Sequence, residues 1–246
     1  MGSPWRYIVT VADVFLISGF LGMIAYFMFP SLPDIILKTT CQKVEALARL
    51  LPFPMERFML SITLWNTMTI LITTFGGLIA LTLDRLVTRY APDVLRRSMN
   101  NPPYAPILVK LARKLGFDVR RYKEADVILT LKLGPLLIPA INGFAAGAFG
   151  MWVLQNFGPV FLLGAALLPH GVIEFPTLII AGAMGVHLAD YLIYRVRLHE
   201  RWPHGNLEVP SWVIRNTAAC IAGLTVAAYL EVHITPIVAG CVMKCA

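Results

Sequence analysis

Five long apolar segments dominate this chain and limit what it can fold into. They cover about residues 8–29, 59–83, 127–153, 172–193 and 213–232. Each is close to the ~20 residues that an α-helix needs to cross the hydrocarbon of a bilayer. The composition agrees, because 57% of the 246 residues are hydrophobic and only 14% are charged. We therefore expect an all-α, polytopic membrane helix bundle with five transmembrane helices, formed by residues 1–246 as a single integral membrane domain.

A sixth apolar stretch, residues 159–168, has only about ten residues. That length is too short to span a bilayer alone and is typical of a re-entrant or half-membrane helix. The alternative is that it forms part of a sixth crossing. We prefer five crossings, because a sixth would place the two most basic connections on opposite sides.

The basic residues predict the orientation. The net charge is +7, and ten Lys and Arg residues lie in the connection 85–127, with three more in 195–210. Such connections remain in the cytoplasm, which predicts a cytoplasmic N-terminus and an extracytoplasmic C-terminus in the plasma membrane. The positive charge then reports topology and attraction to the lipid bilayer. We expect no nucleic-acid partner, since no zinc, RNA-recognition or helix-turn-helix signature is present.

Two regions outside the spans are amphipathic. The basic insert 85–127 contains a helical apolar pattern over residues 107–115, interleaved with lysine and arginine. Such a helix lies on a membrane surface or docks a cytoplasmic partner. The extracytoplasmic region 31–56 predicts an amphipathic helix over residues 34–51, with Asp34 as its N-cap.

Polar residues inside the spans are the candidates for a functional site, because they are costly in hydrocarbon. The main cluster contains His170 and Glu174, which share one face of a helix. The predicted intramembrane polar site also includes Asn142 and Asn66. The residues expected to break the helix beside it are Pro169, Gly171 and Pro176.

Three interpretations of this cluster stay open. The polar side chains fix packing by hydrogen bonds across helices, or they form an ion, lipid or substrate site, or they hold a catalytic metal. The metal is least favoured, since a third ligand is unidentified and catalytic zinc usually has three. His187 lies about 20 Å from Glu174 along one helix, so it cannot complete the set. Lys132 is expected to reach the cytoplasmic surface.

Small residues and cysteines leave two further questions. Gly143 and Gly147 form a small-xxx-small face that packs either within one chain or between protomers. Cys41, Cys241 and Cys245 lie on the same predicted side and form a disulfide, a metal pair or unpaired thiols.

The run Leu168–Pro176, followed by the Ala/Gly-rich stretch 179–185, resembles the signature of the stage II sporulation protein M family. That family carries a Pro-His-Gly-x-x-Glu-hydrophobic-Pro run before such a helix. Its preceding helix carries an Asn-Gly pair, matched by Asn142-Gly143, and an earlier helix an Asn before a glycine-rich end, matched by Asn66 with Gly76-Gly77. The resemblance covers spans two to five, and the basic insert has no counterpart in it.

The resemblance implies a membrane scaffold, since the namesake recruits peptidoglycan-degrading partners during engulfment. We therefore expect a non-enzymatic scaffold or subunit of a multi-protein membrane assembly, with other membrane proteins or further copies as partners. No catalytic residue, metal or cofactor is expected. The alternative is a transporter, channel or lipid-handling protein that uses His170 and Glu174.

Overall fold

The computed structural model describes residues 3–51, 56–90, 105–117, 119, 122–161, 170–198 and 209–238. These residues contain seven α-helices and one π-helical turn, and no strand occurs among them. The elements are α1 (Pro4–Met28), α2 (Leu32–Leu50), α3 (Arg57–Tyr90), α5 (Ala105–Lys114), α6 (Tyr122–Phe161), α7 (Gly171–Leu198), α8 (Ser211–Tyr229) and η2 (Leu230–Ile234).

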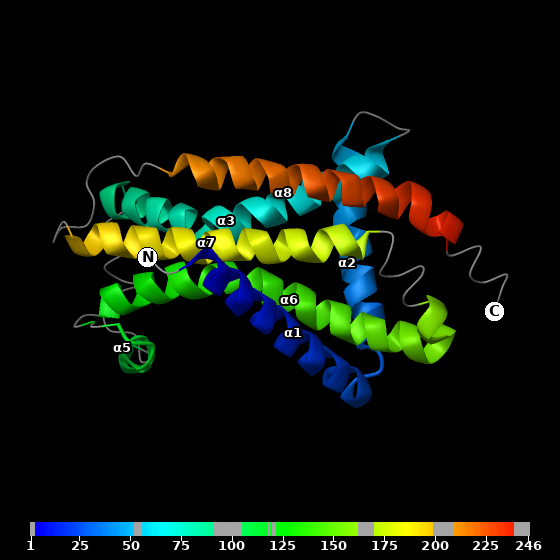
Figure 1. The fold of residues 1–246 in the computed structure, drawn as a ribbon, viewed down its shortest axis with the longest axis horizontal. Helices are drawn as coiled ribbons and strands as arrows, with labels where there is room; N and C mark the ends of the chain where they lie inside the picture. Colours follow the sequence, from blue (N-terminus) through cyan, green and yellow to red (C-terminus); the bar gives the residue numbers. More distant parts are fainter. Residues whose placement is uncertain are drawn as a thin grey trace.

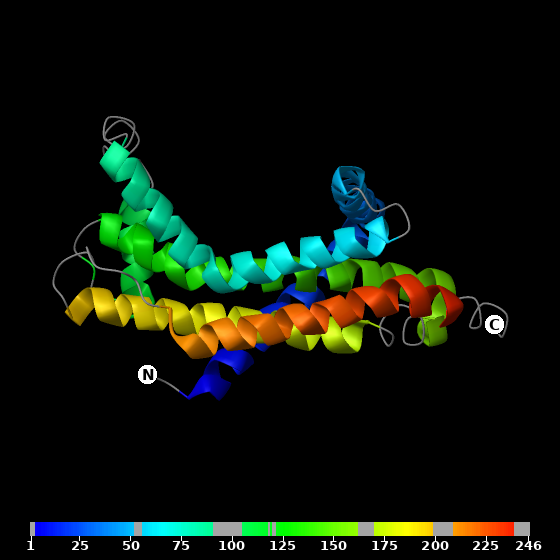
Figure 2. The same cartoon turned by 90° about the horizontal axis from the view of Figure 1, so that it is seen from above.

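Five of these helices are long and apolar enough to cross a membrane, as the sequence predicts. The membrane-length parts are Pro4–Met28, Arg57–Leu83, Ala125–Pro159, Gly171–Tyr194 and Ser211–Val238. Helices α3, α6, α7 and α8 run along the long axis of the molecule, and α1 crosses them obliquely (Figure 1). The two amphipathic helices lie at opposite ends of this bundle, so we call them the α5 end and the α2 end (Figure 2).

The positions of the helix ends bear on the prediction that the two basic connections lie on one side of the membrane. The C-termini of α3 and α7 and the N-termini of α6 and α8 lie at the α5 end (Figure 1). The C-terminus of α6 and the N-terminus of α7 lie at the α2 end (Figure 1). The helices that flank both basic connections therefore terminate at one end of the bundle, as five crossings require. The chain bends at Gly158 (φ 81°, ψ 173°) before Pro159, and residues 162–168 of the predicted half helix lie outside the described residues.

Helix α7 is the central element. Half of its apolar span is buried inside the protein, against 17–28% for the other four spans. Its buried side chains pack against α3, α6 and α8 in two clusters. The first cluster includes Leu81, Leu131, Leu188, Leu192 and Val213. The second consists of Ile70, Ala181, Met184, Cys220 and Leu224. Helix α7 is therefore packed between three neighbouring helices, which fix the positions of its buried side chains.

Glycines decide how α1 meets α6. A Cβ added at Gly19 would lie 3.3 Å from the carbonyl oxygen of Gly143, and one at Gly147 would lie 2.9 Å from Cα of Gly19. The two backbones touch, which only residues without side chains permit. The Gly143-x-x-x-Gly147 face thus packs within the chain, which answers the question that its spacing leaves open.

Helix α2 begins two residues before the predicted start. Its N-cap is Ser31, Pro33 lies in the first turn, and Asp34 follows in that turn instead of capping it. Proline suits this position because its missing N–H would have no partner there in any case. Val44 of α2 packs against Ile62 of α3 and Ala228 of α8, which anchors the helix across the α2 end.

Candidate functional site

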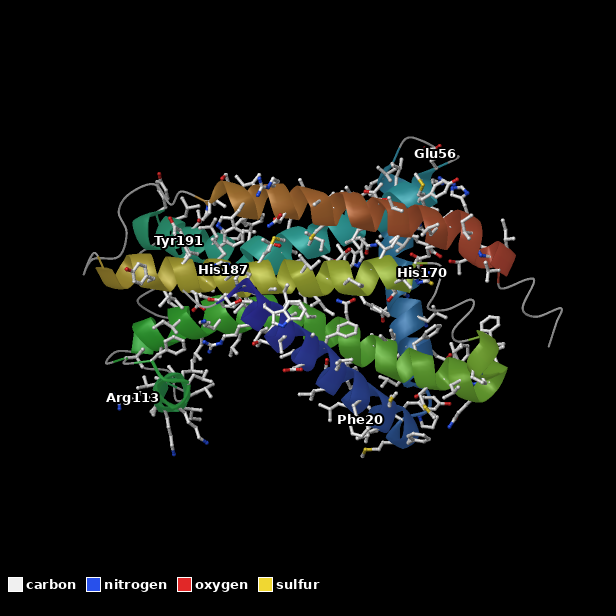
Figure 3. All side chains as sticks on the ribbon, viewed as in Figure 1. Phe20, Glu56, Arg113, His170, His187 and Tyr191 are labelled. Carbon is white, nitrogen blue, oxygen red and sulfur yellow. The ribbon has the colours of Figure 1, made fainter. Side chains whose placement is uncertain are left out.

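His170 and Glu174 lie at the first turn of α7, at the α2 end of the bundle (Figure 3). The carbonyl oxygen of His170 accepts hydrogen bonds from the backbone N–H groups of Ile173 and Glu174, both at 3.0 Å. The helix begins at Gly171 and continues through Pro176, whereas Pro169 lies outside the described residues. His170 and Glu174 are thus one turn apart, as the i, i+4 spacing predicts.

The last span supplies two further members of this cluster. Its helix changes to the π-helical turn η2, and Thr235, which follows η2 directly, donates from Oγ1 to the carbonyl oxygen of Leu230 at 3.2 Å. The same hydroxyl lies 3.3 Å from His170 Nδ1. Glu231 lies close enough to interact electrostatically with both Glu174 and His170. We call His170, Glu174, Glu231 and Thr235 the α7–η2 cluster.

All four members of the α7–η2 cluster are partly buried. The imidazole and the hydroxyl are in contact where α7 begins and the last span ends, and the two carboxyl groups interact with this region electrostatically. Turns of the π-helical type occur frequently at functional sites. Such a set of groups can exchange protons or bind a cationic group. Sequence reasoning missed Glu231 and Thr235, although their polarity in the last turns of an apolar span is the kind of signal that marks candidates.

The two predicted asparagines are placed elsewhere. Asn142 donates from Nδ2 to the carbonyl oxygen of Ile138, at 2.9 Å, within α6. Asn66 lies partly buried on α3, and within the described part of the chain it makes no hydrogen bond to the α7–η2 cluster. The structure therefore unites His170 and Glu174 with the last span and not with the asparagines.

A second polar group lies further along α7, toward the α5 end (Figure 3). The ring of His187 stacks between Tyr7, at 4.7 Å between centroids, and Trp212, at 4.6 Å. The 17 residues between His170 and His187 correspond to about 25 Å of helix, so the two histidines belong to different sites. This stack ties α1 and α8 to the central helix.

Lys132 and Asp190 form an ion pair between α6 and α7. Both side chains are partly buried, and the ammonium group of Lys132 also lies 5.9 Å from the ring centroid of Phe117. Lys132 was expected to extend to the surface; it instead pairs with a carboxylate on the neighbouring helix, which compensates both charges. Among the described residues, no group of three or more His, Cys, Asp and Glu residues is arranged to hold a metal ion.

Residues 127–236 match the sequence model of the family Stage II sporulation protein M. The predicted resemblance to this family is confirmed. The match begins in α6, contains all of α7, α8 and η2, and includes every member of the α7–η2 cluster. It covers somewhat less than half of the chain, so the weaker similarity proposed for Asn66 and Gly76-Gly77 in the second span lies outside it. The comparisons with curated proteins and with solved structures found no match.

Proposed function

We propose that the protein is a non-enzymatic, polytopic membrane protein that serves as a scaffold or subunit of a multi-protein assembly. The stage II sporulation protein M match and the five membrane-length helices support a membrane protein. The proposal places it in the plasma membrane, with the α5 end in the cytoplasm because the basic connections lie there. Its partners are other membrane proteins or further copies of the chain.

One observation carries this proposal: a carboxylate stands exposed on the outer face of α1. Asp13 is exposed, and so are its helical neighbours Leu16 (66%) and Phe20 (63%). Along the helix axis, Asp13 lies about 14 Å from the start of α1 at Pro4, at 1.5 Å per residue. In the described part of the chain, Asp13 has no ion-pair or hydrogen-bonding partner.

A carboxylate inside a span is costly in lipid, by about 2.5–3.5 kcal/mol at the helix centre, and such groups almost always face protein or water. The glycine face of α1 is occupied by α6, so the face with Asp13 is the one available to another chain. A polar or cationic group of a partner helix would remove the cost. An assembly therefore explains why the carboxylate and the apolar side chains share one face.

Photo-crosslinking in native membranes tests this arrangement. A photoreactive amino acid at Phe20 is expected to form an adduct with a discrete membrane protein or a second copy. The matched control carries the same group at Val226, which is 51% exposed on α8. Asp13→Ala is expected to abolish the Phe20 adduct, and Asp13→Glu to retain it. Lipid adducts alone at Phe20, or an adduct that is unchanged by Asp13→Ala, would contradict the proposal.

The α7–η2 cluster favours a second candidate function, a transporter, channel or lipid-handling protein. Glu231 lies in the π-helical turn and interacts electrostatically with His170 and with Glu174, and a proton or cation pathway uses such ionisable groups. The test is flux or lipid exchange in proteoliposomes that contain wild type or Glu174→Gln. Equal flux in both, or none above empty vesicles, would count against this function.

A further inference from the structure

Helix α5 has more apolar surface than the bundle covers. On one side, Leu108, Val109 and Ala112 face the start of α6, where they pack with Phe117, Val119, Ala125, Ile128 and Leu129. Ala105 is buried as well. This contact fixes α5 to the end of α6. The remaining apolar side chains of the helix take no part in it.

Those remaining side chains form an exposed stripe. Ile107, Leu111 and Leu115 follow one another at intervals of four residues and are 65%, 38% and 50% exposed. At about 100° per residue they occupy one side of the helix, next to the buried side. Lys110 and Lys114 are exposed and lie along the far edge of this stripe. The order around the helix is thus buried face, exposed apolar stripe, lysines.

The direction of α5 fits a membrane surface. Figure 1 shows α5 along its own axis, whereas α3, α6, α7 and α8 run across the picture. The helix is therefore roughly perpendicular to the membrane-length helices and parallel to the plane of a bilayer that they would cross. It also lies at the end of the bundle where the basic connections lie. An apolar stripe beside lysines, held parallel to the bilayer, is the arrangement of an interfacial helix.

An open concavity of about 490 Å³ lies beside the basic side of α5. The described residues that line it are Ala105, Pro106, Val109, Lys110 and Arg113. Arg113 donates from Nε to the carbonyl oxygen of Val119 at 3.1 Å, which positions its guanidinium group while other N–H donors remain. At about 100° per residue, Arg113 and this concavity lie on the side of α5 opposite Leu111, so they take no part in a contact between the apolar stripe and lipid.

We propose that α5 is an anionic-lipid sensor of the α5 end: Ile107, Leu111 and Leu115 insert below the headgroups, and Lys110 and Lys114 bind phosphates of anionic lipids. A lipid surface fits better than an acidic protein, because the stripe is only one helix wide and its axis follows the bilayer plane. The inference requires membrane insertion but not the proposed assembly. Each lysine near an anionic surface changes binding by about fivefold.

Hydrogen–deuterium exchange of the full chain in lipid nanodiscs tests this role. The discs contain either zwitterionic phosphatidylcholine alone or a mixture with anionic phosphatidylglycerol, and the chain is purified to homogeneity. Exchange in a peptide over residues 105–115 is expected to be at least fivefold slower in the anionic discs. Lys110→Gln/Lys114→Gln should remove this difference, as should high salt, which screens surface charge.

The matched control is Lys38→Gln/Arg49→Gln, which removes two exposed basic residues from α2 at the opposite end. This variant should retain the lipid-dependent protection of α5. Exchange in α6 reports whether each variant is folded. Equal exchange of α5 in the two lipids would overturn the proposal, and so would protection that appears only when a co-purifying protein is added, which would assign the stripe to a protein partner.

Discussion

Gly147 offers a sharp test of the contact between α1 and α6. A Cβ at this position would lie against the carbonyl oxygen of Gly19 and 2.6 Å from its carbonyl carbon. Ordinary contacts of this kind begin at 3.4 Å, so Gly147→Ala requires the two helices to separate by at least about 0.8 Å. The atoms in the way belong to the backbone of α1, and no rotamer change can relieve the overlap.

The expected cost follows from this geometry. Overpacking typically destabilises by about 1–3 kcal/mol, and a rigid backbone contact takes the upper value. Alanine recovers up to about 1 kcal/mol, because it is a better helix former than glycine. Gly147→Ala should therefore lose about 2 kcal/mol. The control, Gly76→Ala on α3, meets its nearest heavy atom at an ordinary 3.7 Å and should gain up to about 1 kcal/mol.

Reversible unfolding by sodium dodecyl sulfate in mixed micelles, followed by circular dichroism, measures both free energies. The two variants should differ by about 3 kcal/mol, which is more than a hundredfold in the folding equilibrium constant. The wild type should lie between them. A Gly147→Ala protein as stable as Gly76→Ala would refute the close approach of α1 and α6.

Three further predictions follow from the other contacts. Lys132→Met leaves Asp190 unpaired and should lower the free energy of unfolding by about 1–3 kcal/mol in the same titration. The double variant Lys132→Met/Asp190→Asn should recover most of this stability. No recovery would mean that loss of the ion pair is not what destabilises Lys132→Met. His187→Ala removes one ring and its two stacking contacts, with Tyr7 and Trp212, and should cost about 1–3 kcal/mol. His187→Phe should retain most of the stability, and equal losses in both variants would argue against stacking. Cys41 is a free, exposed thiol on α2, so in a variant without the other cysteines a membrane-impermeant maleimide should label it in intact cells; labelling only after permeabilisation would reverse the proposed orientation.

The candidate site shows where prediction from sequence stopped. His170 and Glu174 were identified because four residues along a helix return to the same face, which is a local property. Glu231 and Thr235 lie about 60 residues further along the chain, and nothing in their spacing indicates which turn of α7 they meet. For Asn142 the structure gives a hydrogen bond within its own helix, from Nδ2 to the carbonyl oxygen of Ile138, which a pattern of polar residues along the chain does not reveal.

The number and length of the apolar helices, the two amphipathic helices and the similarity to the stage II sporulation protein M family follow from the amino-acid sequence alone, since each depends on composition or on patterns along a single segment. Tertiary structure alone decided that α7 is central, that Gly147 packs on α1 of the same chain, and that Asp13 faces outward. The physical reason is that an apolar span is nearly uniform around its circumference. Its pattern therefore predicts a helix but not the rotation of that helix, and the rotation is set by close packing between backbones.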